Sequence, residues 1–268
     1  MLKSWLWRWG PALVLVTGLV LFWEIYVQVS GIRPTVLPGP RRVLTALLDF
    51  QDVIIENTEQ TLLETVLGFG VALGAGFLFA VLLDLSALLR RAIYPLLVAS
   101  QTVPLVAIAP LLVIWFGYDI VPKIIVVWLV CFFPIVVAGV DGFTATDPET
   151  TRLFKSMGAT RAQIFWKLRL PSALPFLFSG IRIAITYSVA GAILGEYVGA
   201  EKGLGIFIQR SKNSGRNDLV FAAVLVTAVV SILLFLSVSL LQRRVMPWYY
   251  LMQSKPDQSS KFKIPGTA

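Results

Sequence analysis

Long stretches without a charged residue constrain this chain more than any other feature. An α-helix rises about 1.5 Å per residue, so about 20 residues cross the roughly 30 Å of hydrocarbon in a bilayer. Charges fall in clusters, and the neutral intervals between them run over 65–83, 92–118, 124–140 and 219–242. Each interval is close to or above the crossing length, so the sequence predicts an integral membrane protein.

Two further apolar stretches carry a single charge each, Glu24 in the first and Arg182 in the second. The backbone must satisfy its own hydrogen bonds in lipid, and the apolar runs do not alternate as barrel strands would, so helices are expected. The chain is 14% charged, whereas a soluble domain is about 25% charged. We predict an all-α fold with about six spans, at 9–29, 61–83, 92–116, 122–140, 174–198 and 219–241.

The basic residues predict the orientation. With the N-terminus inside, 15 of the 23 lysines and arginines lie on the cytoplasmic side and eight lie outside. The positive-inside rule therefore predicts that both termini are cytoplasmic. The same rule accounts for the basic loops, so nucleic-acid binding is not needed to explain them. We expect an N-terminal helix with an external segment (1–56), a core (57–243) with a cytoplasmic loop (143–170), and a polar cytoplasmic tail (244–268).

The chain lacks the usual parts of an enzyme site. It has no histidine, and Cys131 is its only cysteine, so a cysteine framework or a histidine base is excluded. No G-x-x-x-x-G-K-[ST] phosphate loop occurs, so we expect no bound cofactor and no ATP hydrolysis by this chain.

Two features inside the spans suggest a path or close packing. Polar residues stand before a helix-breaking proline in the third span and in the middle of the fifth. The candidate translocation path is Ser100, Gln101, Thr102, Pro104, Tyr187 and Ser188. Polar packing between helices is the alternative. Glycines at four-residue spacing predict close helix approach; they are Gly70, Gly74, Gly191 and Gly195. The roles of Glu24, Arg182 and Glu196 stay open, although Glu196 is expected at the interface rather than buried.

The loop after the fourth span has the clearest local signals. Asp147 is a good N-cap with Pro148 at the first helical position, and Gly158 is expected to end that helix. Thr160 is expected to cap a second short helix that continues through Leu168. Two apolar faces follow, Leu153, Phe154 and Met157 on the first helix and Ile164, Phe165 and Leu168 on the second. Such a patch, rimmed by basic residues, marks a partner site. A loop packed on the chain's own helices is the alternative.

This loop resembles the permease subunits of bacterial ATP-binding-cassette importers. Their signature is Glu-Ala-Ala, three residues, Gly, nine residues and Ile-x-Leu-Pro, and here Gly158 precedes Leu168-Arg-Leu170-Pro171 by that spacing. Arg152-Leu-Phe154 departs from the first half. The nitrate/sulfonate/taurine-type branch is similar at 37–40, 110–117, 133–134 and 218–222, and riboflavin and thiamine-precursor permeases at 101–104, 195–200 and 203–205.

The resemblance implies a type I importer in a bacterial cytoplasmic membrane. It implies a second permease copy, two cytoplasmic ATPase subunits that use ATP, and an external solute-binding protein. The residues expected to receive the ATPase are Leu153, Phe154, Met157, Gly158, Ala159, Ile164, Leu168, Leu170 and Pro171. Riboflavin is the first expected solute and a hydroxymethylpyrimidine thiamine precursor the second, with sulfonate, taurine or nitrate as alternatives. A stand-alone secondary transporter or channel is the alternative class, and a membrane enzyme the least supported.

Overall fold

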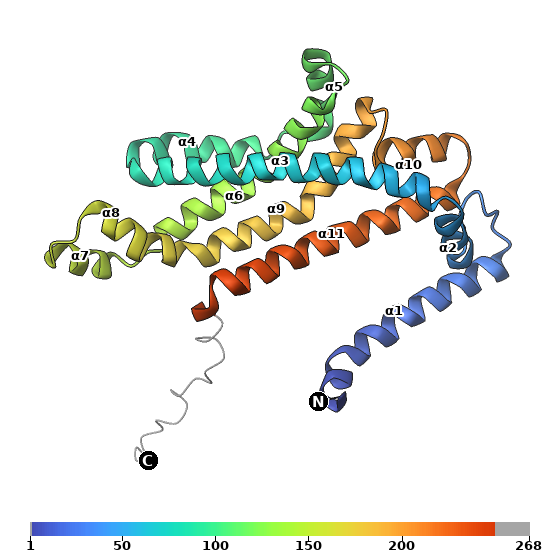
Figure 1. Ribbon diagram of the computed structural model, residues 1–268, viewed down its shortest axis with the longest axis horizontal. Coiled ribbons are helices and arrows are strands. Elements are labelled where there is room, and N and C mark those ends of the chain that lie inside the picture. The colour runs from blue at the N-terminus through green and yellow to red at the C-terminus, as the bar shows by residue number, and fades with distance from the viewer. Residues whose placement is uncertain (1, 250–268) are drawn as a thin grey trace. The chain divides into compact units, whose positions relative to one another are not determined.

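A computed structural model describes the backbone of residues 2–249 and the side chains of residues 10–249, and every regular element in this part is helical (Figure 1). In chain order the elements are α1 (Leu2–Ser30), α2 (Pro40–Asp49), α3 (Gln51–Leu85), α4 (Ala87–Ser100), α5 (Leu105–Phe116), α6 (Ile120–Thr144), α7 (Pro148–Ser156), α8 (Arg161–Ile164), the π-helical turn η1 (Phe165–Arg169), α9 (Leu170–Gly199), α10 (Leu204–Asn213) and α11 (Asn217–Val245). Most of the predicted polar tail lies outside the described residues.

The predicted membrane spans are confirmed. Within the described residues, α1, α3, α6, α9 and α11 are each long and apolar enough to cross a bilayer, and α4 with α5 makes a sixth, broken candidate. The helices extend beyond the predicted bounds because polar ends continue the same backbone hydrogen bonds outside the apolar part. The third span, predicted over 92–116 with a helix-breaking proline, is divided into α4 and α5. Residues 101–104 interrupt it, since proline at 104 disfavours helical backbone at the preceding residue.

The chain divides into two compact units. The first contains residues 1–66, 106–126 and 189–230, and the second contains 67–105, 127–188 and 231–268. The sequence division at 56 and 243 follows membrane topology instead and stays a prediction.

The second unit is built around α6 and α9. Its core combines residues of α3, α4, α6 and α9: Ala80, Leu83, Leu97, Phe132, Val136, Val140, Phe143, Ala173 and Leu177. Glycines let these helices approach closely. A Cβ on Gly180 would lie 2.4 Å from Ala138 Cβ and 2.6 Å from the Pro134 carbonyl oxygen, and one on Gly142 would lie 2.9 Å from the Ala173 carbonyl oxygen.

The first unit holds the short helices α2 and α10 against the longer ones. Val43 of α2, Ile54 of α3 and Ala222 of α11 share one buried cluster. The Glu24 carboxylate of α1 accepts a hydrogen bond from the Arg41 backbone N–H at the start of α2, with a distance of 3.3 Å. A Cβ on Gly39 would lie 3.2 Å from that carboxylate. Glu24 therefore satisfies an otherwise unbonded N–H at the first turn of α2.

Candidate functional site

A side-chain cap fixes the start of α7, the first helix of the loop that follows α6. Asp147 accepts hydrogen bonds from the backbone N–H groups of Glu149 and Thr150, at 3.1 and 3.0 Å, and from the Thr150 hydroxyl at 2.5 Å. These bonds hold the pKa of the Asp147 carboxyl below its ordinary value, so the cap stays ionised at neutral pH. The predicted N-cap and first-turn proline are confirmed.

Gly158 ends α7 in a left-handed conformation, with φ +78°. Its N–H donates to the Lys155 carbonyl at 3.0 Å, and the Ala159 N–H donates to the Phe154 carbonyl at 3.0 Å. This pair of bonds is the Schellman motif, in which the residue after the cap needs positive φ. A Cβ at this position would have no neighbour within 4 Å. Glycine is therefore needed here for its conformation and not for space.

The second predicted helix is shorter than expected. Thr160 caps α8 through a capping box with Gln163, but α8 ends at Ile164. The chain then widens into η1, where the Leu170 N–H donates to the Phe165 carbonyl five residues back, and continues as α9. Pro171 explains the wide turn, because its ring clashes with the carbonyl four residues earlier in a regular α-helix. The prediction of a separate helix through Leu168 is wrong.

Three large apolar side chains of this loop are exposed. Met157 is 76% exposed, Trp166 64% and Leu153 58%. Ile164 is 5% exposed, and Phe165 packs on Phe143 with ring centroids 5.7 Å apart. The prediction that Ile164 and Phe165 form an exposed face is therefore wrong, since this part of the loop packs on the chain's own helix α6. We call Leu153, Met157 and Trp166 the loop patch.

The other loop residues predicted to contact the ATPase are neither fully buried nor highly exposed. Phe154, Ala159, Leu168, Leu170 and Pro171 are all partly buried. Their contact with an ATPase, like that of the loop patch, stays a prediction.

The candidate path residues all lie in the second unit, in different surroundings. Gln101 is exposed and lines a cavity of about 380 Å³ with residues of α6 and α9. The Ser100 and Thr102 hydroxyls donate to carbonyls of α4 at 2.7 Å. Tyr187 is exposed, whereas Ser188 is buried and donates to the Ile185 carbonyl. The structure brings Gln101 alone of this set to the cavity. Its place in a path stays a prediction.

The predicted packing glycines also differ among themselves. A Cβ on Gly195 would lie 3.0 Å from Lys123 Cα, but Cβ atoms on Gly70 and Gly74 would meet nothing within 4 Å. Gly191 is buried. The surface at Gly70 and Gly74 is therefore left open by the described part of the chain.

Side chains from α3 and α9 cap the start of α10. Glu196 is 0% exposed and accepts hydrogen bonds from the Thr61 hydroxyl, at 2.6 Å, and from the Gly205 N–H. The Thr61 oxygen accepts the Leu204 N–H at 2.8 Å, and Asn57 Oδ1 accepts the Gly203 N–H at 2.8 Å. These side chains satisfy the unbonded N–H groups at the start of the helix. We call this cluster the α10 cap.

The α10 cap corrects the expectation that Glu196 is interfacial. A Cβ on Gly203 would lie 2.3 Å from Glu196 Cδ, and one on Gly205 would lie 2.7 Å from the Ile193 carbonyl oxygen. Gly203 also has φ +130°. The Gly-Leu-Gly spacing was the signal that a buried group lies against this turn, but it did not identify the acid.

Replacing Glu196 by alanine is expected to loosen α10. The Gly205 N–H would lose its acceptor in a buried site, which costs about 1–3 kcal/mol. Hydrogen exchange of the purified chain should show faster exchange over 203–213, with the Asp147–Gly158 segment unchanged. Glu201→Ala, which removes an exposed acid nearby, is the matched control. Equal exchange in both variants would contradict the capping role.

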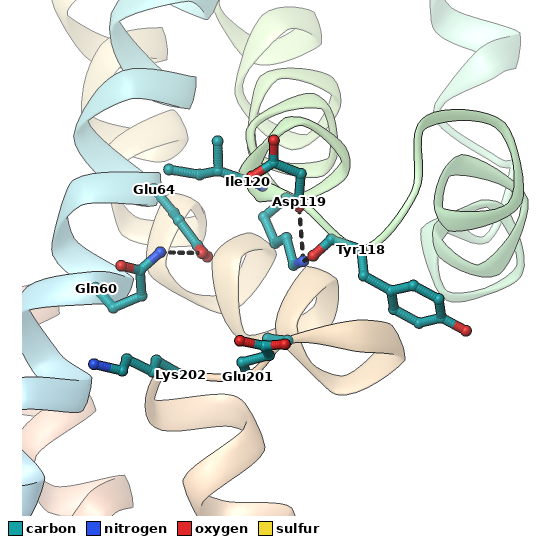
Figure 2. Close-up of a pocket in the computed structure, with 9 residues that line it drawn as sticks. Gln60, Glu64, Tyr118, Asp119, Ile120, Glu201 and Lys202 are labelled. Carbon is teal, nitrogen blue, oxygen red and sulfur yellow. Dashed lines mark hydrogen bonds between the residues drawn. The ribbon is translucent and has the colours of Figure 1, made fainter.

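A polar cavity of about 430 Å³ also lies in the first unit (Figure 2). Gln60 donates to Glu64 at 2.8 Å on one side. Lys123 donates to the carbonyls of Tyr118, Asp119 and Gly199 at 2.5–2.7 Å. The ammonium group thus joins the end of α9 to the turn before α6. Within residues 10–249, no group of three acids, cysteines or histidines is arranged to hold a metal ion.

Residues 72–248 match the family described as "Binding-protein-dependent transport system inner membrane component". The chain belongs to this family. It is an inner-membrane permease subunit of an ATP-binding-cassette importer, as the resemblance implied.

Relatives in this permease family carry several different solute names. The chain is 37% identical to a formylaminopyrimidine transport permease protein of Halalkalibacterium halodurans, over 86% of this chain and 92% of the relative. It is 32% identical to a riboflavin transport system permease protein of Chloroflexus aurantiacus, over 89% and 91%. It is 30% identical to a taurine transport system permease protein of Escherichia coli, over 91% and 93%. The predicted branch of the family is therefore confirmed.

A solved structure shows the same permease fold. A chain of the MetNI methionine ABC transporter, in an inward-facing conformation, superposes with a TM-score of 0.64 at 21% identity. The match covers 74% of this chain and 98% of that one. It confirms the type I importer fold.

Proposed function

We propose that this permease receives the motion of a separate ATPase subunit through the α7–α8 loop. The single observation that carries this proposal is the loop patch, whose three large apolar side chains stand exposed on a capped, rigid turn. Basic residues stand near it in the sequence, at Arg152, Lys155, Arg161 and Lys167. An exposed apolar patch with a polar rim fits a protein partner. The sequence has no phosphate loop, so ATP is hydrolysed by that partner.

The proposed assembly has two permease copies, two ATPase subunits and an external solute-binding protein. Open glycine surface at Gly70 and Gly74 is available to a second copy. Closure of the ATPase pair would push α7 and α8, and the continuous helix from 161 to 199 would carry the movement into the membrane. A bundle with two stable packings is the element that such a push would switch.

We propose a pyrimidine-containing vitamin or vitamin precursor as the solute. Formylaminopyrimidine and riboflavin both contain a pyrimidine ring, and permeases named for each are 37% and 32% identical to this chain. Riboflavin was the first solute predicted from the sequence, and the higher identity of the formylaminopyrimidine relative places a pyrimidine precursor ahead of it here. Taurine, sulfonate or nitrate would require a site for a permanent anion.

Uptake into vesicles tests the solute. The complex, reconstituted with its cognate binding protein and ATP, should accumulate a formylaminopyrimidine or riboflavin and not taurine. Taurine uptake with no pyrimidine uptake would contradict the solute proposal alone. Solute flux by the permease without any ATPase subunit would contradict the proposed mechanism and support a stand-alone transporter.

Replacing Met157 by glutamate is expected to weaken ATPase binding by roughly 10- to 100-fold, because burying a charge in an apolar contact costs several kcal/mol unless it is paired. Affinity between the detergent-purified permease and its ATPase subunit measures the effect. Met157→Leu, which keeps the apolar contact, should bind normally. Ala87→Glu adds the same charge at the start of α4 and is the second control. Unchanged affinity in Met157→Glu would exclude the loop patch from the interface.

A further inference from the structure

A cavity of about 430 Å³ lies beside α7 in the second unit, and its lining is basic. The charged side chains that line it are Arg90, Arg152, Lys155 and Arg169, and no acidic residue lines it. The loop patch and the α10 cap contribute none of its lining. Arg152 and Lys155 stand near the loop patch in the sequence, but the other two cations, Arg90 and Arg169, lie outside the coupling loop helices α7 and α8.

Two of these arginines are held in place. Arg169 Nη1 lies 2.7 Å from a carboxylate oxygen of Asp84, a side chain that is almost fully buried. Arg90 donates to the Thr144 hydroxyl at 3.0 Å, while that hydroxyl donates to the Val140 carbonyl at 2.8 Å. Fixed guanidinium groups lose little side-chain entropy when they bind an anion, so the cavity is organised in advance.

The other two cations are uncompensated. Arg152 and Lys155 project from α7, and neither forms an ion pair within residues 10–249. Asp84 offsets one positive charge, at Arg169. The cavity therefore keeps an excess of positive charge next to two adaptable side chains.

One residue of the lining has a buried hydroxyl without a hydrogen-bond partner in the described residues. Thr146 lines the cavity, is 8% exposed, and its Oγ1 forms no hydrogen bond with the described residues. Leaving a buried polar group unbonded costs about 1–3 kcal/mol, so such a group usually has a ligand. A hydroxyl donor among cations fits an oxyanion.

The cavity lies where membrane helices end. Thr144 is the last residue of α6, Arg90 lies in the first turn of α4, and Arg169 directly precedes α9. The positive-inside rule places these ends at the cytoplasmic leaflet. Phospholipid phosphates lie at this depth, and basic pockets between helices on this side bind anionic headgroups.

We propose that this cavity binds the phosphate of an anionic phospholipid headgroup. Arg90 and Arg169 would hold the phosphate, Thr146 would donate to it, and Lys155 would reach it from α7. The bound lipid would tie α7 to the ends of α4, α6 and α9. This regulatory consequence rests on the proposed function, because α7 carries part of the loop patch, whereas the lipid site itself does not.

A lipid fits the cavity better than an acidic side chain of the ATPase. The loop patch already offers the partner an exposed apolar surface, while Thr146 and Arg169 lie at the level of the helix ends. Free phosphate has the same chemistry as the headgroup but lacks the acyl chains that would concentrate it at the membrane. The two sources are separated by competition.

Lipid retention by the purified full-length permease tests the site without an ATPase. Phosphatidylglycerol is titrated into the detergent-solubilised protein, and bound lipid is counted by native mass spectrometry with phosphatidylcholine as the neutral counterpart. Losing one charge-assisted bond should weaken phosphatidylglycerol binding roughly tenfold in Arg90→Gln and in Lys155→Gln. Thr146→Val, which keeps the volume, should weaken it about threefold. Arg161→Gln, the same change outside the cavity, should bind normally.

Several results would overturn the proposal. These are equal retention of both lipids, equal loss in Arg161→Gln, or displacement of phosphatidylglycerol by millimolar inorganic phosphate. A permease that retains no lipid, but whose Arg90→Gln variant binds the ATPase less well in any lipid, would assign the cavity to an acidic partner side chain instead. None of these outcomes touches the ATPase-coupling proposal, which the Met157 variants test separately.

Discussion

Gly158→Pro is expected to leave the permease in the membrane and to abolish ATP-dependent uptake. Proline fixes φ near −65° and has no N–H, whereas Gly158 has φ +78° and donates to the Lys155 carbonyl. The native turn is therefore disfavoured by about 3 kcal/mol, which corresponds to a roughly 100-fold lower population. Uptake and binding-protein-stimulated ATP hydrolysis in reconstituted complexes measure the loss.

Two controls separate conformation from general damage. Asparagine adopts positive φ more readily than other side chains, so Gly158→Asn should retain most of the uptake. Gly215 ends α10 with the same pair of bonds, Gly215 N–H to Lys212 and Arg216 N–H to Ser211. Gly215→Pro should therefore disturb α10 and leave affinity for the ATPase unchanged. Normal uptake by Gly158→Pro would remove the turn from the coupling mechanism.

The sequence predicted this turn well because its determinants are local. Asp147, Gly158 and Thr160 each act on backbone groups within a few residues, and the structure has each in its predicted capping role. The number of spans also depends on local features, since the length and hydropathy of each helix decide whether it crosses the bilayer.

Local patterns did not predict which way a helix face points. Ile164 and Phe165 share one face, as the helical period predicts, but this face packs inward and Trp166 is exposed instead. A helix-breaking proline was predicted in the third span, but hydropathy alone does not show that residues 101–104 leave the helix. Both outcomes depend on contacts and single residues that a hydropathy period does not contain.

Tertiary contacts explain the remaining differences. Glu196 is buried because Thr61 and the α10 backbone satisfy its carboxylate, and these partners are 135 and nine residues away in the sequence. The same limit applies to glycines. Gly70 and Gly74 have the recognised spacing, yet Gly142 and Gly180 make the close contacts between α6 and α9. A spacing motif shows that a helix has a small-residue face and cannot identify the helix that meets it.

Gly180→Ala is therefore expected to open the contact between α6 and α9. The added methyl group would meet Ala138 Cβ at 2.4 Å and the Pro134 carbonyl oxygen at 2.6 Å. Neither is the end of a flexible side chain, so the helices must separate. Overpacking of this kind costs about 1–3 kcal/mol.

The only cysteine of the chain reports this opening directly. Cys131 of α6 is buried and its thiol donates to the Ala184 carbonyl of α9 at 3.3 Å, four residues from Gly180. A thiol-reactive dye should label Gly180→Ala faster, and at a lower temperature, than the parent protein. Gly18→Ala in α1, where the added Cβ meets nothing within 4 Å, should label at the parent rate. Equal labelling of all three proteins would mean that the two helices tolerate the methyl group, so the close approach at Gly180 would not hold this contact together.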